Sequence, residues 1–221
     1  MIEQRFRSDY PGEFVVLETR WANGKKEQKR EWIDNPIDNQ HISGRAAVIG
    51  SNIDKTIFDY TRLQKHRGGL LGKKRLQTYA TNNIWKEMQL DFAVETEDAN
   101  LTSILETTYA TENIVYTSST NCIRHPGEFY LIPFNPRLDM LALPIYLAAF
   151  DGHQEIFLLG YNNEIISGTR NWKTDIDLIF KAYPSAKFYL VGVESNMPDI
   201  WRKNRNVACM LHKDFITYCD V

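Results

Sequence analysis

The chain has 221 residues, of which 43% are hydrophobic and 24% charged, which fits one sizeable globular domain and argues against a disordered chain or two full domains. Lys and Arg together number 26 and Asp and Glu number 28, so the net charge is -2; this excludes a globally basic nucleic-acid binder but not a local basic patch. No window approaches the roughly 20 apolar residues that a membrane span needs, and residues 1–14 have no apolar core of the signal-peptide kind. We therefore expect a cytoplasmic protein with no membrane partner.

The first 44 residues differ in pattern from the rest. One strand-like run, Glu13 to Thr19, lies between turn signals at Pro11-Gly12 and Asn23-Gly24, and the residues after it are polar and charged. The sequence predicts an N-terminal hairpin or arm over residues 1–44, packed on a main domain that covers residues 45–221.

From Arg45 onward, short apolar runs alternate with helical patterns. This alternation is typical of parallel βαβ units, and runs that are apolar on both faces indicate a sheet covered on both sides. We expect an α/β fold with a mostly parallel sheet and helices on both faces. The predicted strands are 46–50, 76–80, 91–95, 113–117, 129–133, 155–160, 187–192 and 207–211, and the predicted helices are 54–66, 99–109, 138–150 (kinked at Pro144) and 175–183.

Two polar loops follow predicted strands at the edge where such sheets bind ligands. The first contains Gly50, Ser51 and Asn52, before a predicted helix. Backbone N–H groups at a helix start favour phosphate, but the loop could equally be a plain helix cap. The second contains Asn82 and Asn83, which suit a phosphate, a ribose or a base edge, or a simple turn.

Positively charged residues suggest an anionic ligand. Arg137 opens the predicted helix 138–150, where its charge gains nothing from the helix dipole. The segment from Arg62 to Arg75 carries six basic residues and no acidic one, so it could grip a phosphate backbone or form a solvated loop. Its basic residues are Arg62, Lys65, Arg67, Lys73, Lys74 and Arg75.

Other chemistry is sparse. Asp175 lies where a helix begins and could be a general base or a helix cap. The five histidines lack metal-ligand spacing, and Cys122, Cys209 and Cys219 form no CxxC pair, so we expect neither a metal site nor disulfides.

In several motifs the chain resembles the bacterial sialyltransferases of glycosyltransferase family 42 and, more distantly, the pterin diphosphokinase-like (MptE-like) proteins. The family's GNGPS-type loop and DYSRL helix end compare with GSNID at 50–54 and DYTRL at 59–63. Its Arg-Cys-Asn loop compares with Ala80-Thr81-Asn82. Its GYKEIYLSGID strand, which follows an arginine-led helix, compares with GHQEIFLLGYN at 152–162.

Two more motifs follow, so that the resemblance spans about residues 45–196. The family's NTD helix start compares with Lys173-Thr174-Asp175, and its LYCLCPNS strand with FYLVGVES at 188–195. The resemblance implies a Rossmann-like domain that binds a nucleotide sugar, UDP- or CMP-linked, without a metal or other cofactor. The residues that it places at the donor are Gly50, Ser51, Asn52, Asn82, Asn83, Tyr161 and Asn162.

The chain departs from the family at its catalytic base. The family's histidine aligns with Arg170, so we expect Asp175 to act as the base, while Arg170 and Arg137 stabilise the leaving phosphate. The whole chain is also similar to putative glycosyltransferases of T4-like phages, some of which are linked with adding arabinose to hydroxymethylcytosine in DNA. This implies a double-stranded DNA acceptor on the basic segment, in the host cytoplasm.

Two other functions stay open. A pterin or nucleotide diphosphokinase on the same fold would need Mg²⁺, for which Glu95, Glu97 and Asp98 are the candidate ligands, although a helix start rich in acids explains them equally well. A non-catalytic nucleotide-binding protein would have kept the fold and lost the base, as the arginine at position 170 allows.

Overall fold

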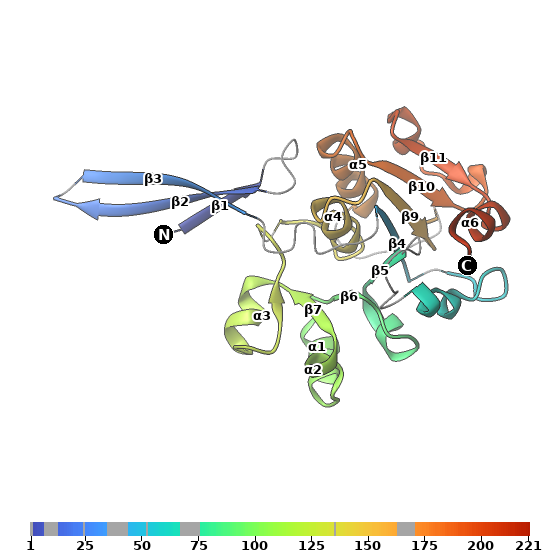
Figure 1. Ribbon diagram of the computed structural model, residues 1–221, viewed down its shortest axis with the longest axis horizontal. Coiled ribbons are helices and arrows are strands. Elements are labelled where there is room, and N and C mark those ends of the chain that lie inside the picture. The colour runs from blue at the N-terminus through green and yellow to red at the C-terminus, as the bar shows by residue number, and fades with distance from the viewer. Residues whose placement is uncertain are drawn as a thin grey trace.

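The computed structural model describes residues 2–6, 13–23, 25–34, 44–51, 53–66, 76–134, 136–162 and 171–221. Its centre is an eight-stranded sheet in the order β11-β10-β9-β4-β5-β6-β7-β8 (Figure 1). Every pair of neighbouring strands is parallel. The strands are β4 (Arg45–Ile49), β5 (Leu76–Ala80), β6 (Phe92–Val94), β7 (Ile114–Thr117), β8 (Tyr130–Leu131), β9 (Glu155–Leu159), β10 (Lys187–Val191) and β11 (Val207–Met210).

Helices cover both faces of this sheet, as the sequence predicts for strands that are apolar on both sides. Successive residues of β4 belong to different cores, with Val48 in one and Ile49 in the other. The first core packs against α4 (Leu143–Phe150) and α5 (Trp172–Ala182), and the second against α1 (Asp98–Leu105), α2 (Tyr109–Glu112) and α6 (His212–Cys219). The predicted Rossmann-like α/β class is therefore confirmed. None of the described helices is long and apolar enough to cross a membrane.

Three predicted helices differ from the structure. The one predicted over 99–109 is interrupted at residues 106–108, which separate α1 from α2. The stretch 54–66 contains no α-helix: a turn leads into the 3-10 helix η1 (Tyr60–His66). The Oδ1 atoms of Asp54 and Asp59 each accept the backbone N–H two residues ahead, and these local bonds compete with helix formation. The helix predicted over 138–150 begins only at Leu143, so that Pro144 lies in its first turn, where a missing N–H costs nothing, and causes no kink.

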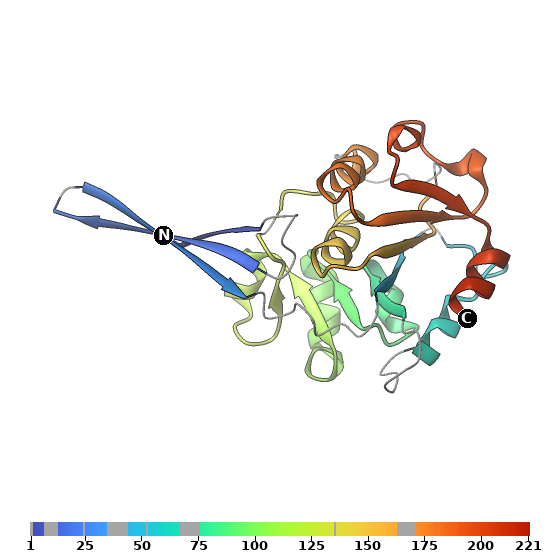
Figure 2. The ribbon, with the colours of Figure 1, turned by 45° about the horizontal axis from the view of Figure 1, so that its top comes forward.

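The N-terminal residues form a second sheet, which projects away from the central one (Figures 1 and 2). It is antiparallel and consists of β1 (Ile2–Phe6), β2 (Glu13–Ala22) and β3 (Lys25–Asp34). The sequence predicts only part of β2, because β3 is mostly charged and lacks an apolar alternation. The turn signal at Asn23 is confirmed: its φ of 52° is the left-handed conformation of tight hairpins. The division into an arm and a domain near residue 44 stays a prediction.

Candidate functional site at the carboxyl edge of the sheet

The strand order reverses between β4 and β9. From β4 the chain moves outward through β5, β6, β7 and β8, then returns to β9 on the other side of β4. Ile49 pairs with Leu159, and the N–H of Gly50 donates to the Leu159 carbonyl at 2.7 Å. Parallel sheets bind ligands outside the carboxyl ends of strands at such a switch point. The loops after β4 and β9 therefore frame the candidate site.

Two glycines allow these loops to pack on each other. Gly160 has a φ of +74°, and a Cβ there would lie 2.7 Å from the backbone nitrogen of Ile53. A Cβ on Gly50 would lie 3.0 Å from the ring of Tyr161. Contacts inside the protein thus account for both glycines, so neither by itself indicates a phosphate.

The first loop lacks the α-helix on which the phosphate expectation depends. Ser51 is exposed and available to a ligand, and Asn52 lies outside the described residues. In the described residues that follow Ser51, a turn leads into a 3-10 helix, so no α-helix begins there whose N-terminus could attract an anion.

The ring of Tyr161 packs against Gly50 and so supports the first loop. It is buried, its hydroxyl donates to the Leu141 carbonyl at 2.9 Å, and burial raises its pKa well above the usual range. The hydroxyl is therefore not available to a donor nucleotide in this conformation. Asn162, the next residue, is half-buried in the same loop.

The loop after β5 contributes polar groups at the same edge. Thr81 is buried, Asn82 has a left-handed φ of 60° at the start of the 3-10 helix η2 (Asn82–Lys86), and Asn83 is exposed. Asparagine adopts this conformation more readily than most residues. The structure therefore leaves the Asn83 side chain accessible to a ligand.

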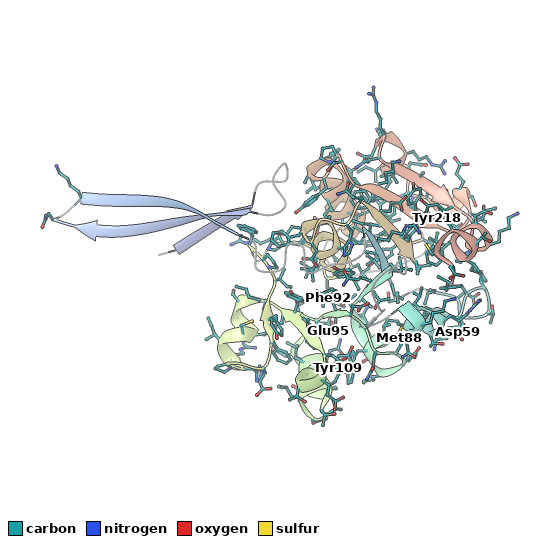
Figure 3. The ribbon with its side chains drawn as sticks, in the orientation of Figure 1. Asp59, Met88, Phe92, Glu95, Tyr109 and Tyr218 are labelled. Carbon is teal, nitrogen blue, oxygen red and sulfur yellow. The ribbon has the colours of Figure 1, made fainter. Side chains whose placement is uncertain are left out.

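Glu95, which directly follows β6, is the most unusual group at this edge (Figure 3). It is 1% exposed, and its Oε1 accepts the hydroxyl of Thr81 at 3.1 Å. Burial raises the pKa of its carboxyl group to about 7, although hydrogen bonds from Thr81, Asn100 and the backbone of Asn82 act in the opposite direction. The sequence marks this acid only as a possible Mg²⁺ ligand, although an acid directly after an apolar strand could have indicated a site of its own.

The three acids considered for magnesium do not form a metal site. Asp98 pairs with Arg124 at 2.6 Å, while Glu97 is exposed and Glu95 is buried. Within the described part of the chain, no group of three or more His, Cys, Asp or Glu side chains could hold a metal ion.

Asp175 has a structural partner. It lies in the first turns of α5, is 8% exposed, and its Oδ2 accepts the backbone N–H of Asp139 at 2.7 Å. It thereby holds the segment before α4, and the helix cap itself is Asn171. Arg137 is exposed in that segment and lies well before α4, so it does not open the helix as expected. Arg170 lies outside the described residues.

The basic segment is described only at its start. Arg62 is exposed, and its Nη2 donates to the main-chain oxygen of Val221 at 2.9 Å. Lys65 is exposed. The remaining predicted DNA contacts lie outside the described residues: Arg67, Lys73, Lys74 and Arg75.

A separate open groove of about 590 Å³ lies between η2 and the helices α1 and α2. Trp85 and Tyr109 line it, with ring centroids 5.2 Å apart. None of the predicted site residues lines this groove.

Comparison of the chain with family models, with curated proteins and with solved structures finds no match. The likeness to glycosyltransferase family 42 therefore stays a prediction from the motifs, and the assignment of a function depends on the geometry of the edge.

Proposed function

We propose that the chain is a glycosyltransferase that binds a nucleotide sugar at the carboxyl edge of its sheet, beside the switch between β4 and β9. The observation that carries this proposal is the pairing of those two strands. It brings the Gly50 loop next to the Gly160 loop, although the two are far apart in sequence. These are two of the segments through which the motifs resemble a nucleotide-sugar enzyme.

The proposed reaction needs a base, an acceptor hydroxyl and a leaving nucleotide. The base takes the hydroxyl proton, the acceptor oxygen bonds to the anomeric carbon, and the bond from that carbon to the phosphate oxygen breaks. Asp175 stays our choice of base, which requires its Oδ2 to exchange the N–H of Asp139 for the acceptor proton. Arg137 and Arg170 are the cations proposed for the leaving phosphate.

The proposed acceptor is hydroxymethylcytosine in double-stranded DNA, with arabinose as the proposed sugar. Support for this part comes from the concentration of positive charge between Arg62 and Arg75 in a chain of net charge -2. Changing Lys73, Lys74 and Arg75 together to Glu should weaken DNA binding and reduce its dependence on salt. Unchanged affinity and salt dependence in this triple variant would remove DNA as the acceptor.

The donor is tested by thermal unfolding with CMP, UDP, GDP and ADP, their sugar conjugates, and ATP with magnesium. A ligand at about 100 times its dissociation constant stabilises the fold by roughly 2.7 kcal/mol, which corresponds to several degrees for a chain of this size. We expect a metal-independent shift with a UDP or CMP compound. A shift only with ATP and magnesium would instead indicate the diphosphokinase. A shift without transfer to any acceptor would indicate a non-catalytic nucleotide-binding protein.

A further inference from the structure

No positive charge faces the buried Glu95 among the described residues. Its carboxyl group meets neutral donors from Thr81, Asn100 and the backbone of Asn82, and the charge that acts on it, on Glu97, is also negative. Lys86, the basic residue nearest in sequence, is exposed and lies over the ring of Trp85, and Arg124, the next one after Glu95, is paired with Asp98. The Oε2 atom of Glu95 is buried without a hydrogen-bond partner in the described structure. Such a group destabilises the fold, so its presence calls for a reason outside folding.

The position of Glu95 supplies that reason. It follows β6, which is separated from β4 by β5 alone, so it lies two strand spacings, or about 10 Å, along the edge from the switch point. Thr81 and Asn82, after β5, lie between. A nucleotide that has its phosphates near Gly50 and extends along this edge would bring its sugar toward Glu95.

We propose that Glu95 accepts hydrogen bonds from the vicinal hydroxyls of a sugar ring in the bound nucleotide, with the ribose as the preferred source. This deepens the proposed function and depends on it. An ionised carboxyl group is purely an acceptor, and a vicinal diol offers it two donors side by side. Thr81 already donates a hydroxyl to Oε1, so this geometry accommodates O–H donors, and Oε2 has the capacity for another. Because Oε2 is buried in this conformation, the contact requires a local shift of the loop after β5 that uncovers it.

The experiment uses the ribonucleotide that stabilises the wild-type protein most, its 2′-deoxy analogue and its sugar conjugate. Each is titrated calorimetrically against the wild type, Glu95→Gln and Glu97→Gln. The glutamine at position 95 keeps the shape and removes the charge, and Glu97→Gln changes an exposed acid two residues away. Circular dichroism of each variant shows whether it is folded.

We expect Glu95→Gln to weaken ribonucleotide binding roughly tenfold or more, as for other hydrogen bonds to a charged group. The wild type should bind the 2′-deoxy analogue more weakly than the ribonucleotide by a similar factor. Glu95→Gln should lower the affinity for that analogue little further. Glu97→Gln should bind as the wild type does. Because the diol needs the ionised carboxyl group, wild-type affinity should also rise between pH 6 and pH 8 more steeply than that of Glu95→Gln.

The outcomes separate the two proposals. If no ribonucleotide binds the wild type, the proposed function fails and this inference fails with it. If a ribonucleotide binds, but removal of the 2′-hydroxyl and Glu95→Gln both leave affinity unchanged for the nucleotide and its conjugate, only the inference is overturned. If Glu95→Gln weakens only the sugar conjugate, the diol belongs to the transferred sugar. If Glu95→Gln does not fold, the wild type alone is compared with the two nucleotides. Weaker binding of the 2′-deoxy analogue than of the ribonucleotide would then support the ribose as the source of the diol, and equal binding would overturn the inference.

Discussion

Glu95 should make the stability of the protein depend on pH in a way that one substitution removes. Its pKa rises from 4.5 to about 7 on folding because the carboxyl group is buried. Between these values the folded protein holds a proton that the unfolded chain has lost. Stability therefore falls as the pH rises through this window, and above it the folded state bears a cost of about 3 kcal/mol.

Glu95→Gln cannot ionise, so it should escape that cost. The amide introduces its own constant change in hydrogen bonding, which is the same at every pH. The informative quantity is therefore the difference in unfolding free energy between Glu95→Gln and the wild type, measured by urea denaturation at pH 5 and pH 8. From the two pKa values this difference should increase by about 2.5 kcal/mol in favour of the variant.

Glu97→Gln is the matched control, since Glu97 is exposed and nearby. Its difference from the wild type should change little between the two pH values. An equal Glu95→Gln difference at pH 5 and pH 8 would mean that Glu95 titrates as it does in the unfolded chain. The argument for an uncompensated buried carboxyl group would then be wrong.

Two further predictions concern the packing that supports the edge. Gly127 and Gly160 both have positive φ, but a Cβ at Gly127 would meet nothing within 4 Å, whereas a Cβ at Gly160 would lie 2.7 Å from the backbone of Ile53. In urea unfolding, Gly127→Ala should therefore lower the unfolding free energy by about 1 kcal/mol, and Gly160→Ala by at least about 2 kcal/mol more. Equal losses would contradict the close approach of the two loops. The buried hydroxyl of Tyr79 contacts Asp151 Oδ2 at 2.7 Å and His153 Nε2 at 2.9 Å, so Tyr79→Phe should cost about 2–3 kcal/mol, whereas a loss below 0.5 kcal/mol would mean that the two partners are satisfied without it.

The sequence alone is enough to predict most strands and the class of the fold. Runs such as 155–160 and 187–192 are apolar on both faces, which only a sheet covered on both sides explains, and their alternation with helices favours parallel pairing. The helix predicted over 54–66 was wrong because Asp54 and Asp59 bond locally to the backbone. A pattern of apolar spacing does not register that competition.

Only the tertiary structure decides which strands are neighbours and which polar groups are buried. Nothing in the residues of β4 specifies that β9 lies beside it, because strand order depends on contacts between segments distant in sequence. The same holds for individual side chains. The sequence predicts Asp175 as a base or a cap and Arg62 as a DNA contact, but only the structure shows that the N–H of Asp139 donates to Asp175 and that Arg62 donates to the main-chain oxygen of Val221. Glu95 is an ordinary acid in the sequence, and it becomes unusual only because the fold removes it from water without supplying an opposite charge.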